Sequence, residues 1–530
     1  MKGEKVMKKK LILNVVLALI LVISLTSCAG TKETSQNNSS DLESDKNMEE
    51  LTVNEPTGQP IYGGEVVVAV TNEIDSIDPY LAVAAGTREI LFNVFEGLVK
   101  FNPNGEVIPA VAQTFEVSED FKRYTFKIRD GLKFHNGNNL TIKDVKYSIE
   151  KAISTSTSPA FSNIDDVVTD GSTVILNLKE SDNDLLPFLT ANFCSIIPAG
   201  YEDSGTTPIG TGPFKFVSYD IQQSFVVEKF KDYWDADNVY LDKVTFKLFS
   251  DQNSAYLELL SGTIDVFPSI EIEHYDQLKD DFNITLGYKN IVQVLAFNSD
   301  VEPFTNIKVR QAINYAVNKD EIIDVQSNGY ATKLGSAILP GFKKYFDESL
   351  AEIYEVDIEK AKSLLALAGY ENGFEFTIKV PSNYEFHVRT AELIAAQLEK
   401  IGVIAKIEQV EWATWLEDVY ARRNHEATII GLTGELSPRD WLSRYVSTSN
   451  NNFFNFSSEK YDKAYNDALK EMDEEARVQK YLDIQRILAE EAAAVFIQDT
   501  QFLNVLKPNL YGYTSYPLYV LDMSRIYYVE

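Results

Sequence analysis

The first thirty residues constrain where this chain can fold. Residues 1–10 carry five lysines and one glutamate, and residues 11–23 form an apolar run that only Asn14 interrupts. As a helix this run would reach about 20 Å, short of the roughly 30 Å of hydrocarbon in a bilayer. A cationic start, a short apolar run and small residues after it are typical of a secretory signal peptide. We therefore expect residues 1–27 to be removed and the remainder to fold outside the cytoplasm.

Residues 25–28 read Leu-Thr-Ser-Cys and resemble the bacterial lipobox, in which cleavage precedes the cysteine and the thiol is lipidated. The resemblance implies a palmitate-type lipid on Cys28. This anchor would hold the chain to the cell membrane on its extracytoplasmic face, in the periplasm or at the outer cell surface. The alternatives are an ordinary signal peptide or an uncleaved anchor, with Cys28 incidental. Residues 31–50 are polar and cannot bury enough surface to offset their ordering entropy, so residues 28–58 are predicted to be a disordered tether.

The chain from Cys28 onward is too long for one hydrophobic core, and we expect two or three domains. The only other cysteine is Cys194, so a disulfide framework is excluded once Cys28 is lipidated. Stability must then come from large apolar cores. The aromatic content of 12% suits such cores and also suits a ligand cavity.

The formal net charge is −30, and removal of the basic leader would make it more negative. Nucleic-acid binding depends on lysines and arginines that neutralise phosphates, so nucleic acid is excluded as a partner. Electrostatic adhesion to anionic lipids is disfavoured for the same reason. The charge indicates a solubilising surface, with attraction of cationic solutes as the alternative. We expect a monomer.

Hydrophobic periodicity predicts interleaved strands and helices, the pattern of an α/β fold. Residues 115–129 alternate like one arm of a hairpin whose turn is Asp130-Gly131. Thr141 is predicted to open a helix with Asp144 at its third position. Further strands are expected at 64–70, 174–178, 374–380, 403–410, 427–432 and from 495, and helices at 87–98, 309–317, 358–367, 390–401, 412–421, 461–469 and 478–492.

Motifs for catalysis or metal binding are missing from the sequence. His425-Glu426 lacks the second histidine of a zinc-protease helix, and no Gly-x-Ser-x-Gly elbow occurs. Gly210-Thr211-Gly212-Pro213 fits neither a phosphate loop nor a dinucleotide fingerprint, since Pro213 removes a backbone donor. We therefore expect no catalytic residue, no metal site and no cofactor, and we predict that the chain is not an enzyme. A glycosidase-like carboxylate pair is the alternative.

Several segments between residues 64 and 506 resemble, in family order, the bacterial extracellular solute-binding proteins of family 5, the peptide and nickel class that serves ATP-driven importers. The segments that carry the resemblance are Ile-Pro-Ala-Val-Ala at 108–112, Tyr-Thr-Phe-Lys-Ile-Arg-Asp-Gly-Leu-Lys-Phe-His-Asn-Gly at 124–137, Lys-Asp-Val at 143–145, Pro-Ile-Gly-Thr-Gly-Pro-Phe at 208–214, Asn298 followed by Lys-Val-Arg-Gln-Ala-Ile-Asn-Tyr-Ala-Val-Asn at 308–318, residues 361–370, and Ile-Gly-Val at 401–403.

The resemblance implies a two-lobed α/β fold of the periplasmic-binding-protein type, large type II, with an extra third domain and a ligand cleft between the lobes. Lobe I would comprise 59–82, 207–288 and 505–530, the extra domain 83–206, and lobe II 289–504. It further implies a substrate-binding lipoprotein that captures peptides or peptide-like solutes by hinge closure and delivers them to the permease of an ABC transporter.

One segment suggests how the ligand would be held. Dipeptide-binding members have Gly-Trp-Thr-Gly-Asp after a strand, and that aspartate pairs with the peptide amino terminus. This chain has Gly-Leu-Thr-Gly-Glu at 431–435. The resemblance implies that Thr433, Gly434 and Glu435 contact ligand, with Glu435 receiving a cation and Trp441 nearby in the same site. The alternative is that Glu435 is a solvated loop carboxylate.

Loops 71–73 and 84–87 correspond to cleft-facing loops of the family, which adds Glu73, Gly86 and Thr87 to the candidates. Where dipeptide binders have an arginine for the peptide carboxylate, this chain has Pro381; Arg389 either substitutes for it or lies on a helix surface. Longer peptides are therefore favoured over a free dipeptide. The alternatives are a receptor for a nickel or other metal chelate or for an oligosaccharide, a surface adhesin or sensor of peptide signals, and a hydrolase.

Overall fold

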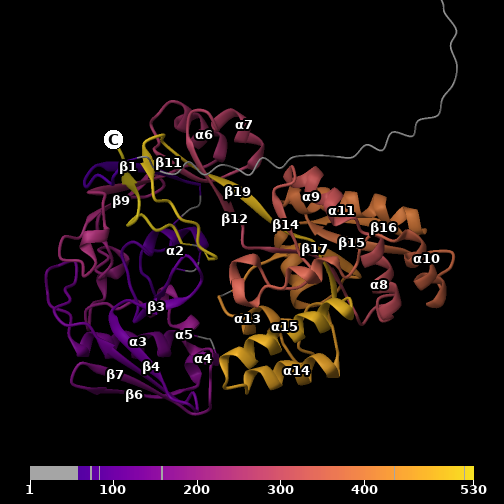
Figure 1. Cartoon of the computed structure of the whole chain (residues 1–530), viewed down its shortest axis with the longest axis horizontal. Helices are drawn as coiled ribbons and strands as arrows, with labels where there is room; N and C mark the ends of the chain where they lie inside the picture. The colour runs from indigo at the N-terminus through magenta and orange to yellow at the C-terminus, as the bar shows by residue number, and fades with distance from the viewer. Residues whose placement is uncertain (1–57, 72–73, 83, 157–158, 435, 519) are drawn as a thin grey trace, which may run out of the picture. The chain divides into compact units, whose positions relative to one another are not determined.

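The computed structural model describes residues 58–71, 74–82, 84–156, 159–434, 436–518 and 520–530 (Figure 1). The predicted signal peptide, the lipidation candidate Cys28 and almost all of the predicted tether lie outside the described residues. The same holds for two of the candidate ligand contacts, Glu73 and Glu435.

The largest sheet has eight strands, and its central strand β1 is buried on both faces. Val66, Val68 and Val70 of β1 pack into one core, while Ala69 packs into another on the opposite face. β1 is parallel to β10 and β11, and the remaining pairs are antiparallel. The order is β12 (Asn283–Tyr288), β19 (Gln498–Leu506), β11 (Val266–Ile270), β1 (Glu65–Val70), β10 (Lys243–Leu248), β9 (Ser224–Lys229) and β8 (Phe214–Asp220), with β14 (Ala331–Lys333) also paired to β19.

A five-stranded sheet forms the centre of the second lobe. Every residue of its strand β13 is buried: Val292, Val294 and Ala296 face one core, and Leu295 and Phe297 face the other. Such two-sided burial is expected of strands that helices cover on both faces. The order is β16 (Ile404–Val410), β15 (Glu375–Pro381), β17 (Ala427–Leu432), β13 (Val292–Phe297) and β18 (Ala494–Phe496).

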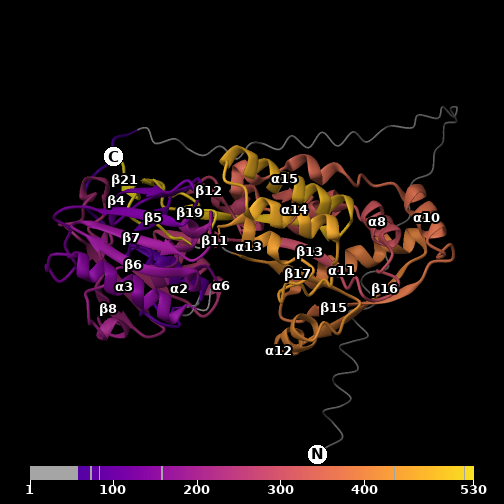
Figure 2. The same cartoon turned by 90° about the horizontal axis from the view of Figure 1, so that it is seen from below.

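Two layers of helices cover this sheet. The core on one face includes residues of α8 (Ile307–Ala316), α9 (Lys319–Ser327), α10 (Ile358–Leu367) and α11 (Glu385–Leu398). The core on the other face includes residues of α13 (Pro438–Ser443), α14 (Glu459–Leu469), α15 (Glu474–Glu490) and the π-helical turn Trp415–Ala421 that follows α12 (Trp412–Thr414). Figure 2 shows α14 and α15 lying side by side in yellow. No helix in the described part of the chain is both long enough and apolar enough to cross a bilayer.

A separate antiparallel sheet of four strands, with its own core, lies between β1 and β8 in the chain. Its order is β4 (Ala112–Val117), β5 (Arg123–Ile128), β7 (Thr173–Leu178) and β6 (Ile164–Asp170). Helix α3 (Ile142–Thr155) packs on it, and α4 (Pro159–Ser162) and α5 (Leu185–Phe188) follow. The predicted helix start is confirmed, because the Thr141 N–H donates to Asp144 Oδ2 at 2.8 Å.

Two predicted elements were wrong in extent. The 115–129 segment is a complete hairpin, in which β4 pairs with β5 around a turn at 118–122, so Asp130-Gly131 is not the hairpin turn. The helix expected at 87–98 is α2 (Ala85–Leu91), and strand β2 (Val99–Phe101) follows it. Asn93 explains the early end: its amide donates to the Ile90 carbonyl (3.1 Å) and the Leu521 carbonyl (2.8 Å), which ties the chain to the C-terminal segment.

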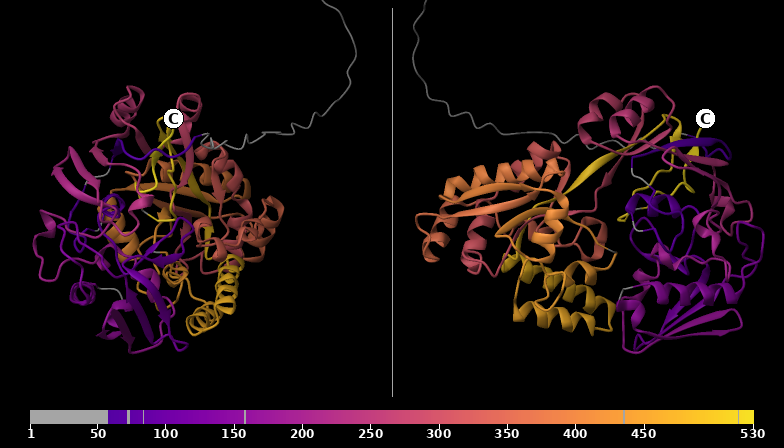
Figure 3. Two further views of the ribbon diagram at one scale, coloured as in Figure 1. Left: turned by 60° about the vertical axis from the view of Figure 1, so that its left-hand side comes forward. Right: turned by 180° about the vertical axis from the view of Figure 1, so that it is seen from behind.

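The chain passes between the large and the five-stranded sheets at two places. Residues 289–291 connect β12 to β13, and β18 is followed directly by β19. β19 pairs with β14 through Gln498–Thr500 and with β12 through Gln501–Leu506. The right-hand view of Figure 3 shows β19 as the long yellow strand between the two sheets. The expected α/β fold with two lobes joined by crossing strands is thus observed.

His135 connects two of the segments that carry the family resemblance. Its Nδ1 accepts the Gly210 N–H at 3.2 Å, and its Nε2 lies 3.0 Å from the Gly212 carbonyl oxygen. Since Gly210 can only donate, Nδ1 is the acceptor and Nε2 carries the proton. Burial lowers the pKa of His135 to about 4, which keeps the ring neutral as this arrangement requires.

The first prediction concerns Gly210, where a side chain would collide with neighbouring atoms. A Cβ there would lie 2.1 Å from the Val94 carbonyl oxygen. We expect Gly210→Ala to cost ~3 kcal/mol or more, because backbone must move to admit the methyl group. Gly205→Ala is the control, since nothing lies within 4 Å of its Cβ position. Thermal unfolding followed by circular dichroism would measure both; equal midpoints for the two variants would contradict this packing.

Candidate ligand-binding site

Two adjoining cavities, of about 310 and 550 Å³, lie beside the C-terminal segment 518–521. Both are lined by Ala85, Leu518 and Val520, so they meet at these residues. The smaller cavity is also lined by Arg88, Phe92, Phe95, Glu96, Gly97, Val99, Lys100, Phe101, Thr190, Ala191, Asn192, Ser195, Pro213, Thr433, Gly434, Asp522 and Ser524. The larger is also lined by Thr71, Glu89, Gln252, Pro268, Ser269, Glu271, Tyr288, Lys289, Asn290, Ile291, Tyr384, Phe502, Tyr513, Ser515, Tyr516 and Leu521.

The loop after β17 is the part of lobe II that reaches the smaller cavity. Thr433 and Gly434, both predicted from the sequence, line it. Gly434 is packed against α13: a Cβ there would lie 2.7 Å from Asp440 Oδ2 and 2.9 Å from the Trp441 ring. Trp441 itself is buried in the core below this loop. The structure therefore places Trp441 beneath the loop and outside the lining of the two cavities as described.

His387 holds the other end of this loop. The Gly431 N–H donates to His387 Nε2 at 3.1 Å, and the side chain of Gln293 lies 3.0 Å from Nδ1. Burial, and then the charge of Lys289, lowers the pKa of His387 to about 4. The neutral ring accepts the Gly431 N–H at Nε2. No sequence pattern pointed to this role for His387.

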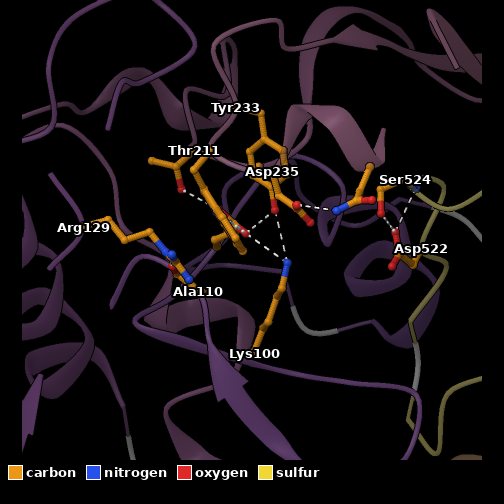
Figure 4. Close-up of polar contacts among 12 residues, drawn as sticks. Lys100, Ala110, Arg129, Thr211, Tyr233, Asp235, Asp522 and Ser524 are labelled. Carbon is orange, nitrogen blue, oxygen red and sulfur yellow. Dashed lines mark hydrogen bonds and ion pairs between the residues drawn. The ribbon is translucent and has the colours of Figure 1, made fainter. Parts of the chain in front are cut away.

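A buried carboxylate organises the wall of the smaller cavity (Figure 4). Glu96 accepts hydrogen bonds from the Tyr233 hydroxyl at 2.7 Å and from Trp234 Nε1 at 3.2 Å, and pairs with Lys100 Nζ at 3.2 Å. The Arg129 guanidinium stacks 3.8 Å above the Trp234 ring. Glu96 and Lys100 both line the smaller cavity, and these partners satisfy the Glu96 carboxylate.

The C-terminal segment supplies a second polar wall. Asp522 accepts from Ser524 N–H at 2.9 Å and from the Tyr516 hydroxyl at 2.9 Å, and it lines the smaller cavity with Ser524. The neighbouring Arg525 pairs with Asp235 at 3.0 Å. The Arg525–Asp235 ion pair joins the C-terminal segment to residues far from it in the chain, beside the cavity.

The remaining sequence candidates have varied positions. Gly86 and Thr87 are buried, and the Thr87 hydroxyl accepts the Asp75 N–H at 3.1 Å. Of the predicted segment 84–87, Ala85 is the residue that lines both cavities. Arg389 is 61% exposed and pairs with Glu385 one turn away on α11 at 2.5 Å. Arg389 is not among the described residues that line the cavities. Its role in binding stays a prediction.

A third set of contacts joins the extra domain to lobe II beside the 433–437 loop. Asp182 and Arg439 form an ion pair at 2.8 Å, the Ser437 hydroxyl donates to Asp184, and the Asn183 amide donates to the Glu471 carbonyl at 2.9 Å. Burial is the main cause that raises the pKa of Asp184 to about 7. Three consecutive residues thus contact Ser437, Arg439 and Glu471, which follow in the chain the segment that the family resemblance assigns to ligand.

The two-lobed α/β fold, with cavities where its lobes meet, defines the class of solute-binding proteins. The family model for bacterial extracellular solute-binding proteins, family 5 middle, matches residues 106–454. The chain belongs to this family.

Relatives within the family differ in what they bind. Heme-binding protein A of Haemophilus influenzae is 31% identical over 80% of this chain and 85% of its own length. Dipeptide-binding protein DppE of Bacillus subtilis is 26% identical over 87% of this chain and 92% of its own. A similar solved structure is the ABC transporter-associated periplasmic binding protein DppA of Helicobacter pylori in complex with the peptide STSA. It matches with a TM-score of 0.71 and 27% identity, and the match covers 89% of this chain and 99% of that one.

The second prediction concerns Asp184. Its folded pKa of about 7 lies above the usual unfolded value near 3.9, so its contribution to stability is present at acid pH and is lost as pH rises toward 7. The loss is about 1.4 kcal/mol per pH unit between those values. Asp184→Asn keeps an acceptor for Ser437 without the titration. We expect unfolding midpoints to fall less between pH 5 and pH 8 in this variant than in wild type.

Asp165→Asn serves as the control for this experiment, because Asp165 is exposed on β6 of the four-stranded sheet. The unfolding midpoint of the Asp165→Asn protein should change with pH as that of wild type does. An Asp184→Asn protein whose midpoint changes with pH as steeply as that of wild type would show that Asp184 is ionised in the folded protein at pH 5.

Proposed function

We propose that this protein is the substrate-binding lipoprotein of an ABC importer and that it captures peptides or peptide-like solutes. The observation that carries the proposal is that both lobes line the two cavities. Helix α2 and the C-terminal segment line both cavities, the lobe II loop Thr433–Gly434 lines the smaller one, and Ile291 and Tyr384 of lobe II line the larger one. A ligand that touches both lobes would stabilise their closure, and the permease would read the closed form. A related protein in the same family has been solved with a peptide bound.

The proposal includes the finer assignments made from the sequence. Glu435, with Thr433 and Gly434, receives the ligand's amino group; Glu73, Gly86, Thr87, Arg389 and Trp441 complete the site. The protein is a monomer without catalytic activity. Its lobe I comprises 59–82, 207–288 and 505–530, its extra domain 83–206 and its lobe II 289–504. A lipid on Cys28 holds it at the extracytoplasmic face of the membrane.

An iron porphyrin is the second candidate ligand, because one relative is a heme-binding protein. Tyrosine can serve as an axial ligand to haem iron, and Tyr384, Tyr513 and Tyr516 line the larger cavity. Among the described lining residues there is no histidine, cysteine or methionine, the other side chains that bind haem iron. The lining therefore favours peptides over porphyrin.

The third prediction tests the ligand class. Native mass spectrometry of protein purified from its host should detect co-purified peptides. Calorimetry with alanine tripeptides and tetrapeptides should give measurable affinity. Glu435→Gln should weaken binding of peptides with a free amino terminus by about tenfold or more, since a desolvated charge pair loses one partner. N-acetylated peptides, which lack that cation, should bind both proteins equally.

A porphyrin or metal-chelate mass in place of peptides would replace the peptide proposal with the second candidate. Equal affinity of wild type and Glu435→Gln for free peptides would leave Glu435 a solvated loop carboxylate. Turnover of the peptides by the purified protein would contradict the non-enzymatic assignment.

The fourth prediction tests the anchor. Cys28→Ala should abolish incorporation of an alkyne-tagged palmitate and move the protein from the membrane pellet to the soluble fraction, because a thiol at this position is required for the lipid. Cys194→Ala is the matched control and should label like wild type, since Cys194 is buried in the extra domain. Unchanged labelling of the Cys28→Ala protein would contradict the lipobox assignment.

A further inference from the structure

Glu89 on α2 is a carboxylate that faces the larger cavity without a partner. It lines this cavity, and its side chain is partly buried. In the described part of the chain no hydrogen bond or ion pair reaches it, and burial alone raises its pKa to about 7. An unpaired carboxylate in such a place is costly, so its charged form requires a cation that the described protein does not supply.

The other carboxylate in the lining makes the contrast clear. Glu271 lies in the same cavity and pairs with Lys289 Nζ at 3.2 Å. Lys289 is thus already engaged by Glu271. Arg88, the neighbour of Glu89 on α2, lines the smaller cavity instead.

The side chains that share the larger cavity with Glu89 are suited to a cation. Five of them are aromatic: Tyr288, Tyr384, Phe502, Tyr513 and Tyr516. Tyr513 is close enough that the charge of Glu89 adds to burial in raising the Tyr513 pKa. Aromatic faces attract ammonium and guanidinium groups, and a carboxylate beside such faces adds a charge-assisted hydrogen bond.

We propose that Glu89 receives a positively charged group of the ligand, an ammonium or guanidinium such as that of a basic side chain, and that the larger cavity selects for solutes that carry one. The assignment rests on the proposed function and adds a second cation site to the one expected at Glu435. The ligand class it names is a basic peptide or peptide-like amine.

The assignment predicts how affinity changes with pH. The charged groups facing the larger cavity with Glu89 are Glu271 and Lys289, which pair with each other, and Tyr513, whose raised pKa keeps it neutral. Among these lining groups, Glu89 is the one whose pKa is raised to near neutrality. The buried Asp499, which accepts the Ile291 N–H, has a pKa raised to about 8 but is not among the described lining residues. A cation binds its ionised form, so affinity for a basic ligand should rise from pH 5 to pH 7, by up to about tenfold per pH unit, and level off above.

The fifth prediction tests this site with matched peptides. Lysine and norleucine, which differ by the ammonium group, would be placed at each position of alanine tripeptides and tetrapeptides, and affinities measured by calorimetry at pH 7.5. Wild type should prefer lysine over norleucine by about tenfold or more at one position at least. Glu89→Gln should lose this preference and keep its affinity for the norleucine peptide, and it should also lose the rise of affinity between pH 5 and pH 7.

Glu202→Gln is the control variant, because Glu202 is exposed and is not among the described residues that line the two cavities; it should retain the lysine preference. Equal binding of lysine and norleucine peptides by wild type, or a lysine preference that survives in Glu89→Gln, would overturn the assignment of Glu89 while the peptide receptor stands. Absence of binding by every peptide would instead overturn the proposed function together with this assignment.

Discussion

The passage of the chain between its two large sheets fixes where a ligand can be held. β19 pairs with β14 at one end and with β12 along the rest, so one strand belongs to both lobes. At the other crossing, Asp499 of β19 accepts the Ile291 N–H at 3.2 Å and thereby fastens the 289–291 link to β19. Lys289, Asn290 and Ile291 of that link line the larger cavity. The hinge and part of the cavity wall are therefore the same few residues.

Buried ionisable groups of two kinds act in opposite directions on stability. Burial holds the pKa of His135, His387 and His425 near 4, so their contribution is lost as pH falls below about 6.5. Burial raises the pKa of Asp184 to about 7 and of Asp499 to about 8, so theirs is lost as pH rises through neutrality. The neutral form of Asp499 also suits its position, since its Oδ2 is buried without a described hydrogen-bond partner. Between pH 4 and 6.5 the effects of the two kinds of group on the free energy of unfolding oppose each other.

Strong local patterns predicted the scaffold well, and contacts between distant segments explain the misses. The strand at 427–432 and the helix at 358–367 have the predicted bounds, because their apolar periodicity matches two-sided and one-sided burial. The helix at 87–98 was too long, since Asn93 bonds to Leu521, more than four hundred residues away. His135 and His387 each hold a glycine N–H in another segment, a role that one residue type in a sequence does not reveal.

The residues that line the site also fall into those that the sequence predicts and those that it does not. Thr433 and Gly434 could be predicted because they occupy a family segment with a fixed place after a strand. Glu89 and Lys100 could not, because their neighbours along the chain resemble those of any amphipathic segment; what distinguishes them is which charges lie near them in space. Lys100 pairs with Glu96, four residues before it in the chain, whereas Glu89 has no such partner among the described residues. A family motif therefore locates the cleft, while the proposed preference for a basic solute rests on the paired and unpaired charges around it.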